Sequence, residues 1–287
     1  MIEILWQKQE LLLSLVKRDL KARYKSSVLG FFWSIGRPLF LSLIIIIVFQ
    51  TIFRFPLSGS PPPPYALHIL AGILPWFFFV GTVSEAVNSI LANGNLVKKI
   101  RIPTEVIPVA VVCSNLLHFA LALVVYHGFY LIYGHFPGWE LLLLPLVVLI
   151  QVIFIAALAL LVASLNVYFR DIGSITEIAL NAWFYLTPVL YSVSLAREQI
   201  CPRLADRLDI SAALAGRVFW LYYLNPMAAI TVAYRRLLLL PSYPTGKEMP
   251  DSQLIVALMV SLAISLICYF VAVRVFRRLS PCFADQI

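Results

Sequence analysis

The sequence is organised around long apolar stretches that are separated by short charged segments. Residues 66–91 and 104–133 contain few charged side chains, and the segment between them, 93–103, holds three cations and no acid. At 1.5 Å per residue, each apolar stretch is long enough as a helix to cross roughly 30 Å of hydrocarbon. Short segments rich in cations are retained on the cytoplasmic side. The chain is therefore predicted to fold as helices in a membrane, with residues 93–103 at its inner surface.

The basic segment has turn formers at both ends. Residues 93–95 read Asn-Gly-Asn and Pro103 closes the segment, so residues 96–102 are predicted to form two turns of helix across the end of the bundle. Another protein can push against such a short helix. A loop that only fixes the topology fits the same residues equally well.

Composition supports a membrane protein and argues against a soluble binding domain. Hydrophobic residues make up 61% of the 287 residues and charged residues 13%. The net charge of +8 comes from cations that flank apolar stretches, so topology and lipid headgroups explain it better than nucleic acid does. His118 and His127 point to opposite faces of a helix, and no metal site is expected. The cysteines also lack metal-binding spacing: Cys113, Cys201, Cys268 and Cys282.

Residues 1–28 form the first of two predicted units. Their apolar residues, such as Leu12 and Leu15, alternate with cations such as Lys17, a pattern typical of an amphipathic helix at the inner membrane interface. The segment lacks the cleavage site of a signal peptide. Ordinary charge flanking a membrane span explains the pattern equally well. The second unit, residues 29–287, is predicted to be a six-helix transmembrane domain.

Six apolar stretches are predicted to span the membrane, which makes the fold an all-α membrane protein: residues 29–53, 66–91, 104–133, 140–165, 174–191 and 253–276. Between the last two, the apolar parts 210–224 and 227–240 are too short to cross and are predicted to be re-entrant or interfacial half-helices. Counting them as a span would put Arg277 and Arg278 outside, against the charge bias. Both termini are therefore expected in the cytoplasm.

Two charged residues lie inside predicted spans. Arg37 comes eight residues after Leu29, and Glu85 lies near the inner end of the second span. A charge in hydrocarbon is costly, so each side chain is expected to face the bundle, and the two are candidates for one ion pair. Snorkelling of Arg37 to the headgroups is an equally good explanation.

The sequence shows no motif for catalysis or nucleotide binding. Gly246 and Lys247 are followed by Glu248 and lack the earlier glycine of a phosphate-binding loop, so ATP is not expected to bind here. The HExxH, GxSxG and acidic-doublet motifs are absent. Scattered acids without an internal repeat also disfavour an ion-coupled carrier. No cofactor is expected in this chain, and an enzyme is disfavoured.

Seven segments carry a family resemblance when taken together: residues 15–25 (LVKRDLKARYK), 29–34 (LGFFWS), 37–39 (RPL), 71–76 (AGILPW), 93–103, 168–171 (YFRD) and 224–227 (LNPM). They resemble the membrane permease subunits of bacterial ATP-binding-cassette (ABC) exporters for O-antigen, capsular polysaccharide and teichoic acid. The resemblance covers nearly the whole chain. Each segment alone is weakly specific, but the combination is specific.

The resemblance implies a homodimer in the bacterial inner membrane, with two copies of a separate ABC nucleotide-binding subunit that bind ATP and magnesium. In that family, the amphipathic helix and the loop between spans two and three contact this partner. The half-helices between residues 210 and 240 would form an outer gate, although residues 200–217 look like an insertion. The implied coupling residues are Arg18, Lys21, Leu96, Val97, Lys98, Lys99, Ile100, Arg101 and Ile102.

The substrate implied by the resemblance is a lipid-linked polysaccharide. Aromatic faces with scattered hydrogen-bonding groups let a glycan slide, because no single contact is strong. The candidate path residues are Phe31, Trp33, Arg37, Trp76, Phe77, Tyr126, Tyr130, Trp183 and Tyr185. The candidates for a lipid pyrophosphate are the inner-leaflet cations Arg23, Lys25 and Arg37. Packing or interface roles for the aromatics, and a topological role for the cations, remain open.

Two other functions remain open. A small-molecule or drug exporter would use the same plan of six spans. A membrane glycosyltransferase or lipid-processing enzyme would act without ATP, and the missing acidic doublet argues against it.

Overall fold

The computed structural model describes residues 8–24, 36, 40, 43, 44, 47, 48, 65–99, 103–239 and 249–287. In this part of the chain the regular structure is entirely helical, with no strand. The all-α class predicted from the sequence is thereby confirmed. The expected first span, residues 29–53, lies outside the described residues except at isolated positions.

Four described segments are long and apolar enough to cross a membrane: Leu67–Ala92, Val106–Ile132, Trp139–Tyr168 and Asp251–Gln286. The helices that form them are α4 (Tyr65–Ala92), α6 (Val106–Ile132), η2 (Trp139–Leu143) with α7 (Leu144–Tyr168), and α12 (Asp251–Leu279) with the short helices after it. The second, third, fourth and sixth predicted stretches are therefore confirmed as long apolar helices.

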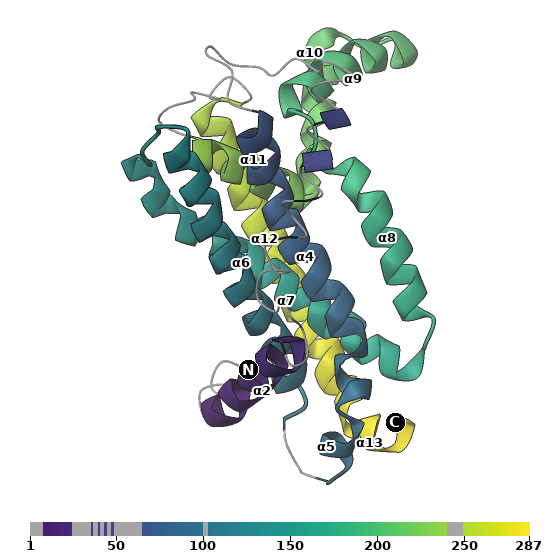
Figure 1. The fold of residues 1–287 in the computed structure, drawn as a ribbon. Coiled ribbons are helices and arrows are strands. Elements are labelled where there is room, and N and C mark those ends of the chain that lie inside the picture. The colour runs from purple at the N-terminus through teal and green to yellow at the C-terminus, as the bar shows by residue number, and fades with distance from the viewer. Residues whose placement is uncertain are drawn as a thin grey trace.

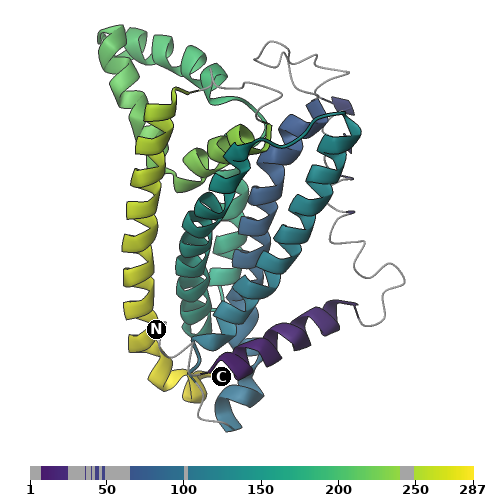
Figure 2. The ribbon, with the colours of Figure 1, turned by 90° about the vertical axis from the view of Figure 1, so that its left-hand side faces the viewer.

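α7 packs against both α4 and α12, and α6 packs against α4 (Figures 1 and 2). Ala157, Ala159 and Ala163 of α7 are buried, and small side chains let helix backbones approach closely in a membrane. Many side chains of α12 instead point away from the bundle. Met259 and Phe270 are exposed, as suits contact with lipid. Following the predicted topology, the end at which α4 begins is called the outer end, and the other the inner end.

α8 (Ile172–Leu186) stands apart from the other long helices, and Leu180 is its one buried residue (Figure 1). Its 15 residues give a helix of about 22 Å, shorter than roughly 30 Å of hydrocarbon. The predicted fifth span, residues 174–191, is thus helical only up to Leu186. The count of six spans stays a prediction.

The outer segment contains a helix that the sequence analysis did not predict. α9 (Val193–Leu208) begins where the Ser192 hydroxyl accepts a hydrogen bond from Leu195 N, at 3.3 Å. It ends where Asp209 adopts the left-handed conformation, with φ of 50°. Local capping chemistry therefore defines both ends of α9.

The two predicted half-helices occupy different environments. The first is α10 (Ala212–Val218) followed by η3 (Phe219–Leu224), which lie with α9 at the outer end (Figure 1). The second is α11 (Pro226–Leu239), and all but one of its 14 residues are buried. Because α11 packs on α4, α7 and α12, it is an internal part of the bundle.

Four short helices gather at the inner end of the bundle. α2 (Gln9–Tyr24) lies across this end (Figure 2), and α5 (Gly94–Lys99) follows α4. After α12 come η4 (Ser280–Cys282) and α13 (Phe283–Gln286), beside α5 (Figure 1). The short helix predicted after residue 95 is confirmed in its described part.

Candidate functional site

α2 docks on the start of α6 through one face of an amphipathic helix. Leu15 and Val16 are buried against Val106, Ile107 and Ala110. Burying one such aliphatic side chain stabilises a protein by roughly 1.5–3 kcal/mol. This apolar contact explains why α2 lies against the bundle. The opposite side of α2 exposes the cations Lys17, Arg18 and Lys21.

The turn before α5 joins this helix to α2. Asn93 donates from Nδ2 to Ser89 O of α4, at 2.8 Å, and its carbonyl oxygen accepts from Leu96 N, at 2.9 Å. Arg18 of α2 donates from Nη2 to Asn93 Oδ1, at 2.5 Å. The two segments predicted to contact an ATPase therefore form one continuous surface.

The predicted coupling residues divide between this surface and the interior. Leu96 and Val97 are partly buried and pack toward the contact of α2 with α6, whereas Lys98 is exposed. The side chain of Lys99 and residues 100–102 lie outside the described part. We call the described exposed cations of α2 and α5 the inner cationic surface: Lys17, Arg18, Lys21 and Lys98.

Three aromatic residues predicted to contact the substrate are buried inside the bundle. Trp76 is 3% exposed. Tyr130 donates from its hydroxyl to Leu239 O, at 3.1 Å, and Tyr126 donates to Leu238 O, at 3.4 Å. Because Leu238 and Leu239 end α11, the two tyrosines tether this half-helix to α6.

The other described path residues lie nearer the surface. Phe77 and Trp183 are partly buried, and Tyr185 is 75% exposed. Trp183 donates from Nε1 to Asn225 Oδ1, at 2.9 Å, which links α8 to the turn before α11. A role in the substrate path stays a prediction for all of them. The remaining candidates lie outside the described side chains: Phe31, Trp33, Arg37, Arg23 and Lys25.

A hydrogen-bonded polar group in the outer half of the core was not predicted. Gln151 of α7 is fully buried and donates from Nε2 to Pro75 O of α4, at 2.7 Å. Its Oε1 accepts from the hydroxyl of Tyr234 in α11, at 2.7 Å. One glutamine thus connects three helices inside the bundle.

Arg235 is also fully buried, and it holds the turn after α8. It donates from Nη2 to Val189 O, at 2.5 Å, and from Nη1 to Tyr191 O, at 2.8 Å. A Cβ atom at Gly72 would lie 2.8 Å from Val189 O and 2.9 Å from Arg235 Nη2, so glycine makes room for this contact. In the sequence, Arg235 and Arg236 are two adjacent cations, and nothing in the sequence distinguishes them.

Glu85 has a hydrogen-bonding partner on the next helix. Asn115 of α6 donates from Nδ2 to Glu85 Oε2, at 2.6 Å. This contact joins α4 to α6. Arg37 lies outside the described residues, so its predicted ion pair with Glu85 stays a prediction.

Two tyrosine side chains meet at the outer end. The hydroxyls of Tyr191 and Tyr222 lie 3.1 Å apart. Burial, followed by this hydrogen bond, raises the pKa of Tyr222 above its usual value. Its hydroxyl therefore stays protonated at physiological pH.

The described residues contain no group of three or more histidine, cysteine or acidic side chains suited to a metal. His127, one of the two histidines considered above, lies with Nδ1 2.7 Å from Leu123 O of its own helix. The four cysteines are free thiols.

The fold defines a class of protein. A bundle of long apolar helices is a multi-pass membrane protein. The chain belongs to the ABC-2 type transporter family, whose model matches residues 10–199. It is therefore a membrane transport subunit of the ABC type.

Three relatives show which kind of ABC transport subunit this chain resembles. The O-antigen export system permease protein RfbA of Myxococcus xanthus is 33% identical over 287 residues, which are 100% of this chain and 99% of that protein. Two proteins of Klebsiella pneumoniae with the same name are 30% and 29% identical over 79% of this chain and 80% of each relative. The resemblance to exporter permeases seen in short segments is confirmed over the whole chain.

Proposed function

We propose that this chain is the permease subunit of an ATP-driven exporter that moves lipid-linked O-antigen across the bacterial inner membrane. The full-length similarity to an O-antigen export permease carries the proposal. Capsular polysaccharide and teichoic acid are the next candidates for the cargo, because they are also polymers built on a lipid.

In this proposal two copies of the chain form the pore, and two separate ABC subunits bind ATP and magnesium. Each permease crosses the membrane six times with both termini in the cytoplasm. The gathering of α2, α5 and α13 at one end supports an even number of crossings (Figure 1). Because α2 lies at the inner end and α4 begins at the outer end, the structure is compatible with a first span between them.

The ATPase partner is proposed to dock on the inner cationic surface and on α5. α5 lies between α4 and α6 in the chain, so a push on this helix reaches both spans directly. The hydrogen bond between Arg18 and Asn93 would transmit the same movement to α2. ATP-driven closure of the partner would thereby shift the permease between two arrangements of its helices.

The glycan path is proposed to follow the exposed face of α8 toward α11. Tyr185 lies on that face, and Trp183 touches the turn before α11. Arg23 lies in α2 at the inner end, where the lipid pyrophosphate would enter with Lys25 and Arg37. α11, held by Tyr126 and Tyr130, is the proposed outer gate.

Deletion of the gene tests whether the exported cargo is O-antigen. Surface O-antigen should disappear while lipid-linked O-antigen accumulates inside the cell, as measured by immunoblots of intact and lysed cells. Unchanged surface glycan with new drug sensitivity would favour a drug exporter instead. Glycan synthesis or lipid processing by the purified chain without ATP would favour the enzyme alternative.

Charge reversal tests the docking surface. Lys21→Glu combined with Lys98→Glu should lower the ATPase activity of the co-purified complex roughly tenfold or more, because charge reversal at a complementary interface costs several kcal/mol. Arg203→Glu is the matched control, since Arg203 is exposed on α9 at the outer end. Equal activity of the Lys21 and Lys98 variant and the control would reject this docking surface.

A further inference from the structure

The segment after α12 turns back against the inner end of the bundle. Phe283 is fully buried, with its ring centroid 5.4 Å from that of Phe276 and 6.2 Å from that of Tyr168. The Tyr168 hydroxyl donates to Leu279 O, at 2.9 Å. Residues 283–287, here called the clasp, are therefore attached to α7 and α12 by a buried aromatic contact.

The clasp touches α5 at a position where only glycine fits the present arrangement. Gly94 is buried, and a Cβ atom there would lie 2.6 Å from Ile287 Cγ2. Its backbone is helical, so alanine would be strained by this contact and not by its φ angle. Val97, one turn further, packs with Ile287 on the same apolar cluster.

α5 depends on such contacts for its position. A helix of six residues is too short to be stable alone. On one side it is tied to α2 through Arg18 and Asn93, and on the other side it meets the clasp. The clasp continues α12, and α12 packs against α7 along the bundle and against α11.

We propose that the clasp is a coupling element that makes α5 and α12 move together, so that a push on α5 reaches α11 through α12. The inference rests on the proposed function, because it requires an ATPase that acts on α5. Arg277 of α12 lies 3.7 Å from Glu105 before α6, which adds a second link between α12 and the chain that follows α5. Movement of the inner loop thus has a route to the proposed gate besides α4 and α6.

A double-mutant cycle on the complete exporter complex in proteoliposomes tests the clasp. Gly94→Ala should lower the amount of glycan exported per ATP hydrolysed by roughly threefold or more, because its methyl group displaces Ile287. Ile287→Ala should also lower this ratio, because the contact is lost. The double variant should recover to within roughly twofold of wild type, since the methyl group introduced at position 94 fills the space that the Ile287 Cγ2 atom leaves.

Gly81→Ala is the matched control, because a Cβ atom at Gly81 meets nothing within 4 Å. Wild-type ratios in both single variants, or a double variant as impaired as the two single effects combined, would overturn the role of the clasp. All variants are compared at equal amounts of assembled complex, so that a loss of folding does not enter the ratio. A wild-type complex that exports no glycan would reject the proposed function itself, and the clasp with it.

Discussion

At the scale of single residues, the outer half of the core is held by polar side chains in an apolar bundle. Arg235 binds two carbonyl groups of the turn after α8, and Gln151 joins α4, α7 and α11. In hydrocarbon, a polar group that loses its hydrogen-bonding partner has no water to replace it. These residues are therefore expected to fix the position of α11 more strictly than its apolar side chains do.

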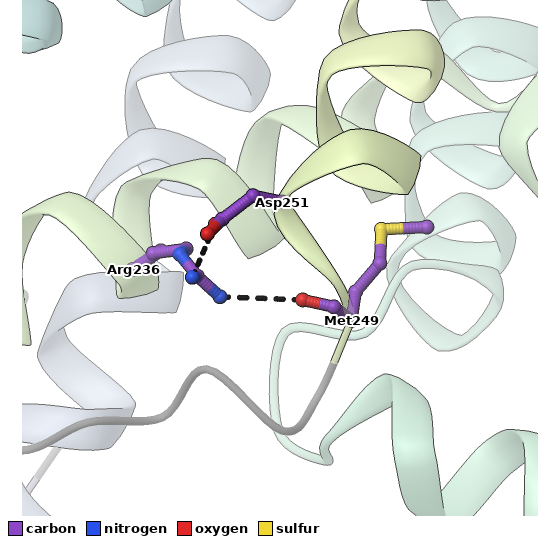
Figure 3. Close-up of polar contacts among 3 residues, drawn as sticks. All are labelled: Arg236, Met249 and Asp251. Carbon is purple, nitrogen blue, oxygen red and sulfur yellow. Dashed lines mark hydrogen bonds and ion pairs between the residues drawn. The ribbon is translucent and has the colours of Figure 1, made fainter.

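Replacing Arg235 should be far more harmful than replacing its neighbour Arg236. Arg235→Ala leaves the buried carbonyl of Val189 and the partly buried carbonyl of Tyr191 without their donor, and each hydrogen bond to a charged group contributes about 1.5–3 kcal/mol. Arg236 donates to Met249 O, at 3.2 Å, and pairs with Asp251, whose side chain is 72% exposed (Figure 3). A pair exposed in this way contributes about 1 kcal/mol or less.

Thermal melting of the purified protein in detergent checks this difference. Arg235→Ala should lower the melting temperature clearly, and Arg236→Ala should lower it less, because Arg236 donates to one carbonyl and its ion-pair partner is exposed. Similar midpoints for the two variants would contradict the hydrogen-bonding role of Arg235.

The hydrogen bond between Gln151 and Tyr234 predicts that substitutions at these two residues have non-additive effects on the free energy of unfolding. Gln151→Leu removes the acceptor of the Tyr234 hydroxyl, and this buried donor then costs about 1–3 kcal/mol. Adding Tyr234→Phe removes the stranded hydroxyl as well, so the double variant should be no less stable than Gln151→Leu alone. Chemical denaturation of the three variants measures this coupling. A strictly additive result would show that the two side chains do not interact.

At the scale of helices, the inner end combines one strong apolar contact with weak polar ones. α2 is attached through Leu15 and Val16, whereas the hydrogen bond between Arg18 and Asn93 is exposed. The apolar contact therefore holds α2 in place, and the polar contact sets its orientation relative to α5. This division suits the proposed role of α2 as part of the docking surface for an ATPase.

Detachment of α2 should follow from a single charge on its buried face. Leu15→Asp places a carboxylate where the side chain is 6% exposed, whereas Leu13→Asp changes a residue of the same helix that is 55% exposed. Limited digestion with trypsin should cut Leu15→Asp rapidly after Lys17 or Arg18, because a charge without a partner does not stay buried. Leu13→Asp should resist like wild type. Equal digestion of both variants would argue against docking through Leu15.

At the scale of the whole molecule, the two ends of the bundle differ in chemistry. The inner end carries the inner cationic surface, α5 and the clasp, and the outer end carries α9, α10 and the aromatic residues of η3. In the proposed exporter, a movement driven at the inner end would reach the outer end through the packed helices between them. The described contacts provide such a route through α12 and α11.

Labelling of single cysteines tests the orientation of the two ends. In a variant without native cysteines, Arg203→Cys on α9 should react with a membrane-impermeant maleimide on intact spheroplasts. Lys98→Cys on α5 should react only after the membrane is opened, because the basic segment is expected to be cytoplasmic. Labelling of Lys98→Cys in intact spheroplasts would reverse the topology and remove the basis of the coupling proposal.

The long spans and the short inner helix follow from patterns that are local in the chain. Residues 66–91 and 104–133 are apolar for long enough to require a helix in hydrocarbon, and the structure has α4 and α6 there. The basic segment also predicted a short helix from residue 96, and α5 begins two residues earlier, at Gly94. α9 was missed because its polar sequence lacks an apolar stretch, although Ser192 is a recognisable helix cap.

The sequence alone determined that this chain is an all-α membrane protein with a basic loop between two spans, because hydrocarbon leaves a backbone few alternatives to the helix. Only the tertiary structure decided that Arg235 is fully buried while Arg236 is partly exposed, and that Ile287 rests on Gly94. Such contacts join residues far apart in the chain, and they depend on which helices pack side by side. Apolar periodicity carries no information about that choice when every helix in the membrane is apolar all round.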